Sequence, residues 1–289
     1  MINDQAFITE SPLNEVVSHF YQLSTANDAE VIVNHIMPNY EMHMIFNFGT
    51  PIRFSFNNEE LNETTISNTA IMGPLRKKLT YEVRPNSDAI VVNFTLNGFY
   101  RLFKIPVSEL TGECLLDPDV LIGDTCFHEL WDKLNSIKDT RKRISLLSDY
   151  VLAFLNTNDK AALPLIKSAP YFNNPTVQPV KAIAFDNNLT ERSIQLRFKK
   201  YVGYSPKELI RFLRFKDVIN HLLTHKDTDL FEVIEKYGYY DQSHLGKDFK
   251  HFLGTTPQQF INSLDGQPFC TRPAQNPIKL VVETSQKSF

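Results

Sequence analysis

The sequence predicts an α+β protein with two domains: an N-terminal antiparallel β sandwich or barrel with following helices, and a C-terminal all-helical domain. Three observations predict this: short strand-forming runs between residues 30 and 96, a unit repeated 51 residues apart in the second half, and polar, proline-containing breaks between the halves. We expect the β-rich domain over residues 1–172, the helical domain over 173–264 and a tail over 265–289. The tail is either disordered or an extended segment on the body.

Six runs of β-branched and aromatic residues in the first half are separated by turn signals such as Gly49-Thr50-Pro51 and Gly73-Pro74. Many short strands at this spacing are typical of an antiparallel sandwich or barrel. The predicted strands are Val31–Val33, Met42–Phe48, Ile52–Phe56, Thr69–Met72, Leu79–Val83 and Ala89–Leu96. We expect their phenylalanines in the core, although a barrel of this size can hold one small molecule.

Helical periodicity follows Gly98. Apolar residues between Ile144 and Leu155 recur at steps of three and four, which predicts an amphipathic helix. Arg141, Lys142 and Arg143 fall largely off its apolar stripe. The stripe either packs on its own domain or forms a contact between two subunits, so a homodimer stays open.

Composition excludes several classes of protein. The chain of 289 residues has a net charge of −3 and ordinary hydrophobic and charged content. It has no apolar run of about 18 residues and no secretory pattern at its start, so we expect a cytoplasmic protein without a membrane partner. Its three cysteines are too far apart to indicate a disulfide framework or a metal site.

No cluster of catalytic or metal-ligating residues is evident in the first half. His19, His35 and His43 are too far apart to share a strand, and no nucleophile or phosphate-loop motif occurs. We therefore expect no metal, no cofactor and no enzymatic activity.

A duplicated unit organises the second half. Residues 198–206 (FKKYVGYSP) recur as residues 249–257 (FKHFLGTTP), with Phe, Lys, Gly and Pro at an offset of 51. A fixed offset indicates a repeated structural unit. Ile183 matches Ile234, and Ile194 matches Leu245, so each unit spans at least two helices.

Helix start and stop signals recur in both units. In the first unit the predicted helices are 177–185 and one that is capped by Thr190 and ended by Gly203, followed by a long helix from Pro206 to Leu223. In the second unit they are 229–237 and one that is capped by Asp241 and ended by Gly254, followed by a last helix from Pro257. Two short helices joined by a tight turn have the helix-turn-helix outline. We expect both units to share the long helix as a common core.

Positive charge gathers in the first unit. Residues 189–216 carry eight basic and two acidic side chains. This is either the footprint of a polyanion or a solvated helix face.

At this point the sequence resembles a known family. Residues 194–206 and 238–257 closely resemble the double helix-turn-helix DNA-binding domain of AraC/XylS-type bacterial transcription regulators, and the resemblance covers about residues 177–261. The first half resembles, around Gly73-Pro74 and residues 93–110, the cupin-like domain that precedes it in some members.

The resemblance implies a regulator that binds double-stranded DNA. Its N-terminal domain would sense a small-molecule effector, form a homodimer, or both, and RNA polymerase would be a partner. We take activation as the working expectation, although the residues leave the direction of regulation open. The alternative is a cupin-like small-molecule-binding protein or enzyme whose helical half mediates protein contacts.

The resemblance also implies which residues meet DNA. Residues 190–200 and 242–250 would be recognition helices in successive major grooves. The base-facing positions are Arg192, Gln195, Leu196, Gln242, Ser243 and Lys247, and the phosphate-facing positions are Thr190, Arg197, Lys199, Lys200, His244 and Lys250. Many members carry Arg where this chain has Leu196, which cannot donate a hydrogen bond. Readout of bases by the first unit is then weaker, uses contact with a thymine methyl group, or relies on Arg192 instead. The other role open to Leu196 is simple packing.

Overall fold

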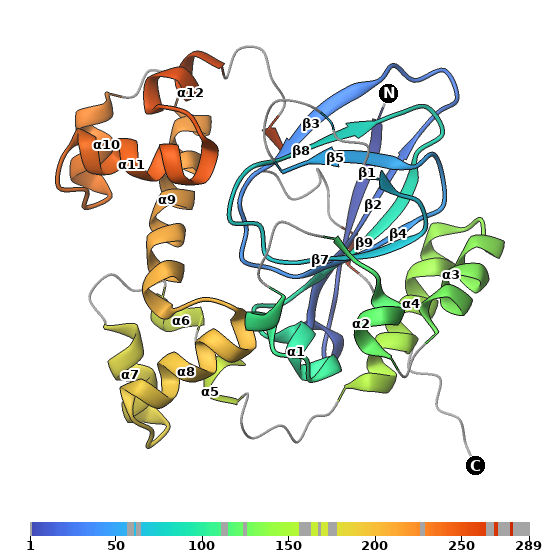
Figure 1. Ribbon diagram of the computed structural model, residues 1–289, viewed down its shortest axis with the longest axis horizontal. Helices are drawn as coiled ribbons and strands as arrows, with labels where there is room; N and C mark the ends of the chain where they lie inside the picture. Colours follow the sequence, from blue (N-terminus) through green and yellow to red (C-terminus); the bar gives the residue numbers. More distant parts are fainter. Residues whose placement is uncertain are drawn as a thin grey trace.

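The computed structural model describes residues 2–56, 61, 65–110, 115–123, 126–155, 163–166, 169–172, 178–225, 229–263, 269–270 and 278–279. Figure 1 shows a β-rich N-terminal part beside a helical C-terminal part, as the sequence predicted. The predicted boundary at residue 173 lies outside the described residues. Leu165 and Phe172, which precede it, pack against the helical core.

Two sheets form the N-terminal part. The first contains β1 (Ile2–Ile8), β2 (Val17–Thr25), β4 (His43–Asn47), β7 (Thr69–Met72), β9 (Asp88–Phe94), β10 (Leu115–Leu116) and β12 (Ile278–Lys279), in the order β10-β7-β4-β9-β2-β1-β12. The second contains β3 (Ile32–Ile36), β5 (Ile52–Ser55), β6 (Thr65–Ile66), β8 (Leu79–Val83) and β11 (Phe269–Cys270), in the order β11-β3-β8-β5-β6. All six predicted strands are present.

The sequence reading missed β1 and β2, which pair antiparallel along their whole length from Ile2 opposite Thr25 to Ile8 opposite His19. Their connection contains a 3₁₀ helix, Leu13–Glu15, instead of a tight hairpin turn. The usual short-range hairpin signal is therefore lacking.

Two short pieces of the tail are extended and lie on the body. β11 pairs parallel with β3, and β12 pairs parallel with β1. Each piece adds a strand to the edge of a sheet. Of the two forms that the sequence allowed, the described part of the tail therefore takes the extended one that lies on the body.

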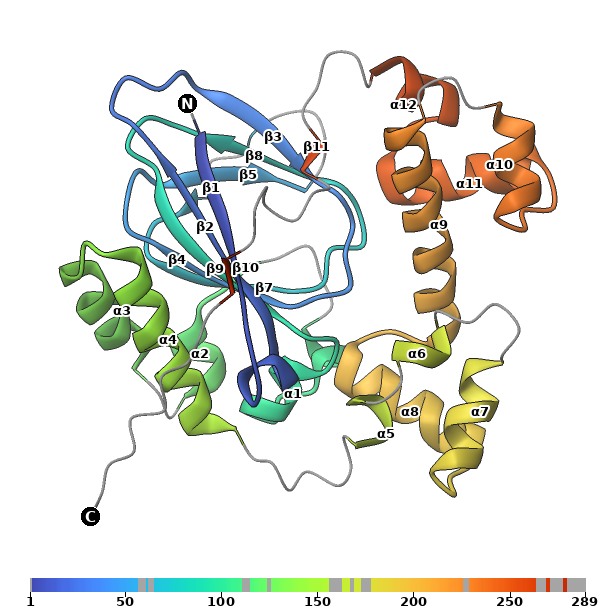
Figure 2. The same ribbon diagram turned by 180° about the vertical axis from the view of Figure 1, so that it is seen from behind.

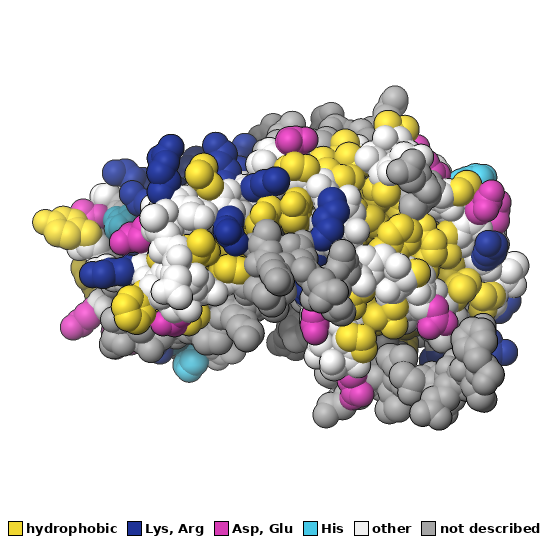
Figure 3. All heavy atoms as spheres, turned by 90° about the horizontal axis from the view of Figure 1, so that it is seen from below, with side chains coloured by type: hydrophobic (Ala, Val, Ile, Leu, Met, Phe, Trp, Pro, Cys, Tyr) yellow, Lys and Arg dark blue, Asp and Glu magenta, His cyan; other side chains and the backbone are white. Residues whose placement is uncertain are grey.

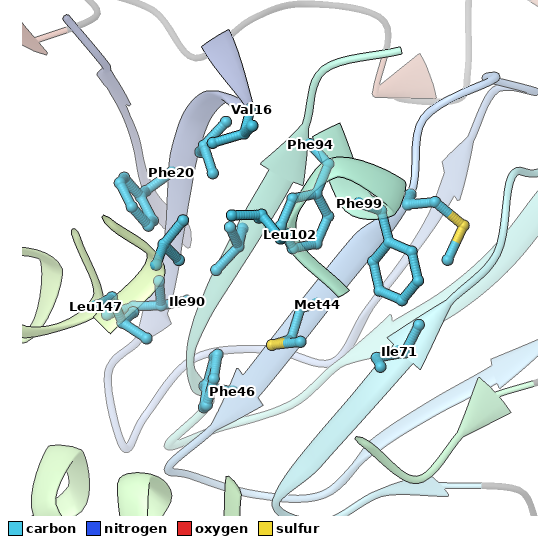
Figure 4. Packing of buried hydrophobic residues seen from close by; sticks show 14 of the residues in the cluster. Val16, Phe20, Met44, Phe46, Ile71, Ile90, Phe94, Phe99, Leu102 and Leu147 are labelled. Atoms are coloured by element: carbon cyan, nitrogen blue, oxygen red, sulfur yellow. The ribbon is translucent and has the colours of Figure 1, made fainter. Parts of the chain in front are cut away.

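The first sheet has two different faces because side chains alternate along a strand. Met44 and Phe46 of β4, with Ile90 and Val92 of β9, belong to the core under the helices. The covering helices are α1 (Gly98–Phe103), α2 (Pro118–Ile122), α3 (Phe127–Ser136) and α4 (Thr140–Phe154). Figure 4 shows this packing, and Figure 2 shows α3 and α4 on the side of the β-rich part away from α9.

Helix α4 matches the predicted amphipathic helix, and its apolar stripe packs on its own domain. The structure corrects the expectation for Arg143, which is buried instead of lying off the stripe. Its guanidinium donates to Asp88 Oδ2 at 2.8 Å and to the Leu134 carbonyl at 3.0 Å, and it lies over the Phe48 ring. A carboxylate and a carbonyl satisfy the charge there, so the residue can be buried.

The helical part contains α5 (Leu163–Ile166), α6 (Ala169–Phe172), α7 (Pro179–Asp186), α8 (Glu191–Val202), α9 (Pro206–Thr224), α10 (Leu230–Lys236), α11 (Gln242–Leu253) and α12 (Pro257–Ser263). The predicted caps are confirmed: the side chains of Thr190, Ser205 and Asp241 accept hydrogen bonds from backbone N–H groups of the first turn. Gly203 and Gly254 end α8 and α11 in the left-handed conformation, with φ of 81° and 70°.

Both units pack on α9 in one hydrophobic core. That cluster contains Ile194 and Phe198 of the first unit, Val233 and Phe249 of the second, and Phe215 of α9. The expected common core is therefore confirmed. It fixes the two short-helix pairs to one rigid helix. No described helix is both long and apolar enough to cross a membrane.

Candidate nucleic-acid interface

Helix α8 presents one polar face to solvent. Arg192, Gln195, Leu196 and Lys199 are spaced by three and four residues, so they share this face, and all four are exposed. Leu196 is 57% exposed although it is apolar. The predicted base-facing residues of the first unit therefore lie together on an accessible surface.

The predicted phosphate contacts of α8 are distributed around that face. Lys199 and Lys200 are exposed in the last turn, and Arg197 is half-buried. The Thr190 hydroxyl accepts a hydrogen bond from Ser193 N–H at 3.1 Å, so it serves as the cap of the helix. The phosphate contacts of the two lysines stay predictions, and their exposure leaves both side chains accessible to a partner.

Helix α11 presents the corresponding face of the second unit. Gln242, Ser243, Lys247 and Lys250 are all exposed. Lys250 Nζ donates to the Gly254 carbonyl at 3.3 Å, a surface contact at the end of the helix. Figure 1 shows α8 and α11 at opposite ends of α9.

His244 is held inside the second unit. Its ring packs edge-on against Tyr239 with centroids 5.0 Å apart, and its Nε2 lies 3.4 Å from Arg214. Its Nδ1 accepts from Tyr240 N–H at 3.5 Å. These contacts give His244 a packing role, and its phosphate contact stays a prediction.

A buried carboxylate locks α11 to α9, and sequence reasoning missed it. Asp248, 1% exposed, accepts from Arg211 Nε at 2.7 Å and from the Tyr239 hydroxyl at 2.9 Å. An amino group of Arg214 lies 3.7 Å from Asp248 Oδ2, the oxygen that also accepts from Tyr239. The repeat could not reveal this cluster, because the position 51 residues earlier is Arg197, of opposite charge.

Sequence reasoning also missed Gly246, which lies on the exposed polar face of α11 beside Ser243 and Lys247. We call this face of α11 and the corresponding face of α8 the reading faces. Glycine inside a helix costs about 1 kcal/mol relative to alanine. A Cβ at this position would meet nothing within 4 Å in the protein. No neighbour among the residues that the structure describes therefore requires a glycine here, and its missing side chain leaves room for another molecule to approach the helix backbone.

Basic side chains concentrate on one edge of the helical part. Figure 3 shows Lys and Arg gathered along that edge, with others toward the β-rich part. Among the described residues, no three His, Cys, Asp or Glu side chains come together as a metal site. The charged surface therefore favours an anionic partner over a bound cation.

A cavity of about 210 Å³ lies between the two sheets and is lined mostly by apolar side chains. Three adjacent strands, β2, β9 and β4, supply its polar patch. Asn93 of the central strand β9 lies opposite His19 of β2 on one side and opposite His43 of β4 on the other. His43 Nδ1 donates to Asn93 Oδ1 at 2.8 Å, and His43 Nε2 lies 3.1 Å from the Asn39 amide. The two histidines do not share a strand, as the sequence indicated, but the sheet brings them together.

Burial fixes the charge state of this patch. It lowers the pKa of His43 to about 4, against the raising effect of the hydrogen bond that His43 donates to Asn93, and the neighbouring His19 lowers it further. Burial also lowers the pKa of His19. The patch is therefore uncharged at neutral pH, and its polar atoms can interact only through hydrogen bonds.

Comparison with known proteins agrees with this geometry. Residues 183–263 match the model of a helix-turn-helix domain, and residues 5–116 match a domain of unknown function, DUF6597. The regulatory protein HrpB of Ralstonia nicotianae is 29% identical over 83 residues, which are 28% of this chain and 17% of that protein. The match thus spans under a fifth of the relative.

Solved structures of ToxT from Vibrio cholerae are similar over most of the chain. One from strain O395 is 15% identical with a TM-score of 0.38, covering 92% of this chain and 98% of that one. Another crystal form is 13% identical with a TM-score of 0.41, covering 92% and 99%.

The site and the fold define a protein with two helix-turn-helix units on a shared helix, preceded by a two-sheet β domain. Such units bind DNA through a recognition helix. Residues 183–263 form a helix-turn-helix domain.

Proposed function

We propose that this protein is a sequence-specific DNA-binding transcription regulator that reads two successive major grooves with α8 and α11. One observation carries the proposal: two capped helices of the same design, each with an exposed polar face, are fixed to opposite ends of one 19-residue helix. Recognition helices on one rigid body reach successive grooves about 34 Å apart on one side of the duplex.

Base readout is assigned to four polar side chains and one apolar one. Arg192 and Lys247 suit guanine, and Gln195 and Gln242 suit adenine. Leu196 offers a methyl contact to thymine. The exposure of all five side chains supports these roles.

Phosphate contact is assigned to Lys199, Lys200 and Lys250. Each is exposed near the end of a recognition helix. Arg197, Thr190 and His244 are weaker candidates, because Arg197 is half-buried and the other two already hold protein contacts. Phosphate contacts add affinity without sequence information.

The experiment that tests the proposal has two stages. Genomic fragments bound by the purified protein are selected and sequenced, and the affinity for the common site is then measured against salt. Lys199→Ala and Lys250→Ala should each lower the slope of log affinity against log salt by about 0.9. Failure to select any common site would overturn sequence-specific binding, and an unchanged slope would remove these two lysines from the interface.

We further propose that the β domain senses a small, largely apolar and uncharged effector in its cavity. An engineered cavity of about 150 Å³ binds benzene, so about 210 Å³ accommodates a larger ring system. The neutral His43 offers hydrogen bonds but no counter-charge for a carboxylate.

The cavity is physically connected to the DNA-binding domain. Asn39 lies beside His43, and the next residue, Tyr40, is buried in the helical core. Its ring centroid is 3.9 Å from that of Tyr204, and its hydroxyl donates to the Glu208 carbonyl at 3.3 Å. A ligand that moves Asn39 would thereby move a side chain packed on α9.

A matched pair of probes tests the effector site. 2-Naphthol should raise the melting temperature and lose that effect in His43→Phe, whereas the charged 2-naphthoate should have little effect. Equal stabilisation by both probes would contradict an uncharged site. The family resemblance further implies a homodimer and a contact with RNA polymerase; sedimentation tests the first and transcription with purified polymerase the second.

A further inference from the structure

The β domain borders both recognition helices. Tyr100 of α1 stacks on Tyr201 of α8, with ring centroids 4.1 Å apart and planes at 26°. The loop between β7 and β8 reaches α11, where Lys78 N–H donates to the Phe252 carbonyl at 3.1 Å. Tyr201 and Phe252 lie on the buried sides of the two helices, so the β domain packs alongside α8 and α11 and leaves their exposed faces open.

One β-domain cation stands beside α8. Lys104 ends α1 and is exposed. Its Nζ is 5.7 Å from the centroid of the Tyr100 ring, and Lys200 Nζ of α8 is 5.8 Å from the same centroid. Two lysines from different domains thus gather around one ring at the last turn of the recognition helix.

A second β-domain cation stands beside α11. Lys77 is exposed in the β7–β8 loop. Burial lowers the pKa of His251, and the positive charges of Arg211, Lys77 and Arg76 lower it further against the raising effect of Asp248. The N–H of the next residue, Lys78, donates to the Phe252 carbonyl at 3.1 Å, so Lys77 lies beside the α11 flank that His251 occupies.

The two positions are equivalent. Lys200 and His251 are separated by the 51-residue offset of the repeat, so they occupy the same flank of their helices. A helix with side chains is about 10–12 Å wide, and the major groove is about 12 Å wide. The groove edges, with their phosphates, must run along these flanks.

Arg76, in the same loop, is engaged within the protein. It donates to the Gly203 carbonyl at 3.4 Å, lies 3.7 Å from Glu208 and covers the Tyr204 ring. This side chain joins the two domains. Lys77 and Lys104 are exposed, one on each of the two bordering segments.

We propose that Lys104 and Lys77 of the β domain contact phosphates of the same duplex that α8 and α11 read. The DNA-binding surface then includes both domains, and the docked arrangement of the β domain is part of the DNA-bound state. This inference rests on the proposed function, since it presumes a duplex on the two reading faces.

The test compares charge-removing and charge-keeping variants of the full chain. Lys104→Gln and Lys77→Gln should each weaken binding about three- to tenfold at low salt and lower the salt slope by about 0.9. The loss should be equal for the cognate site and a scrambled duplex, because phosphates carry no sequence information. Lys104→Arg and Lys77→Arg should keep the parent slope.

Two controls separate the possible failures. Lys133→Gln, at an exposed position of α3 on the far side of the β domain, should leave the slope unchanged. Lys199→Ala reports on the helix-turn-helix interface itself. If Lys199→Ala lowers the slope and the two β-domain variants do not, this inference fails while the proposed function stands; if no variant changes it, the proposed function fails too.

An increase in affinity on removing either charge would also overturn the inference. Such a result would mean that the lysine holds the β domain in an arrangement that restrains DNA binding. Melting temperatures of all variants should stay close to the parent value, which excludes loss of folding as the cause.

Discussion

The two helix-turn-helix units share one design but are fixed in place by different contacts. The second unit holds α11 through the buried Asp248, which accepts from Arg211 and Tyr239. At the equivalent position the first unit carries Arg197, so it has no such carboxylate. Its support comes from the other domain: Tyr201 stacks on Tyr100, and the Tyr204 hydroxyl donates to the Pro74 carbonyl at 3.2 Å.

This difference indicates which unit can respond to the β domain. Beyond the core that both units share with α9, the second unit is held by the side chains around Asp248 and meets the β domain through the Phe252 carbonyl, whereas the added side-chain contacts of the first unit come from the β domain. A shift of the β domain would therefore change the first unit more. On the proposed function, sequence readout by α8 would then be the part of the interface most open to regulation.

The largest expected effect comes from removing the internal lock. Asp248→Ala should lower the free energy of unfolding by about 2–3 kcal/mol, because it leaves Arg211 and Tyr239 without their buried partner. Urea denaturation followed by circular dichroism measures it. Arg197→Ala, the matched change in the first unit, should cost well under half as much, and equal costs would contradict the asymmetry.

The second prediction compares the two reading faces. Arg192 and Lys247 are not equivalent in the repeat: Arg192 matches Ser243, and Lys247 matches Leu196. Each change to alanine should cost about 1–3 kcal/mol of binding to the cognate site. The two cations stand on different turns of their helices. Arg192→Ala and Lys247→Ala should therefore each lose base preference at a different position within the half-site that its helix reads.

Selection of bound sequences with each variant locates those positions. Loss of preference at the same position within both half-sites would show that the two units read in the same way. A uniform loss across all sequences would assign the side chain to phosphate contact instead.

Local signals account for what the sequence predicted well. The helices of both units were found because Ser205, Pro206 and Gly203 mark their ends within a few residues of chain. The six predicted strands likewise lie between local turn signals. The exposed faces of α8 and α11 follow from helical spacing once those ends are known.

Contacts between distant residues account for what was missed. Asp248 meets Arg211 across 37 positions, and His43 meets Asn93 across 50. The burial of Tyr40 in the other domain depends on how the domains dock. No spacing rule connects such residues, so the buried carboxylate, the polar patch of the cavity and the junction emerge only from the fold.

A third prediction uses the glycine of the second reading face. Gly246 stands where the first unit has Gln195. Gly246→Ala should raise the free energy of unfolding by about 1 kcal/mol, since alanine favours the helix and its Cβ has free space. If DNA approaches the α11 backbone there, the same variant should bind the cognate site more weakly. Higher stability with unchanged affinity would show that α11 lies further from the duplex.

The smallest expected effect concerns Leu196, the apolar residue on the first reading face. Leu196→Ala should leave stability within about 0.5 kcal/mol, because the side chain is 57% exposed. If it contacts a thymine methyl, the variant should lose about 0.5 kcal/mol of affinity. Replacing that thymine by uracil, which lacks the methyl group, should then weaken the parent protein by a similar amount and the variant hardly at all. Equal sensitivity of both proteins to uracil would place Leu196 away from the base, and the first unit would then read its site through Arg192 and Gln195.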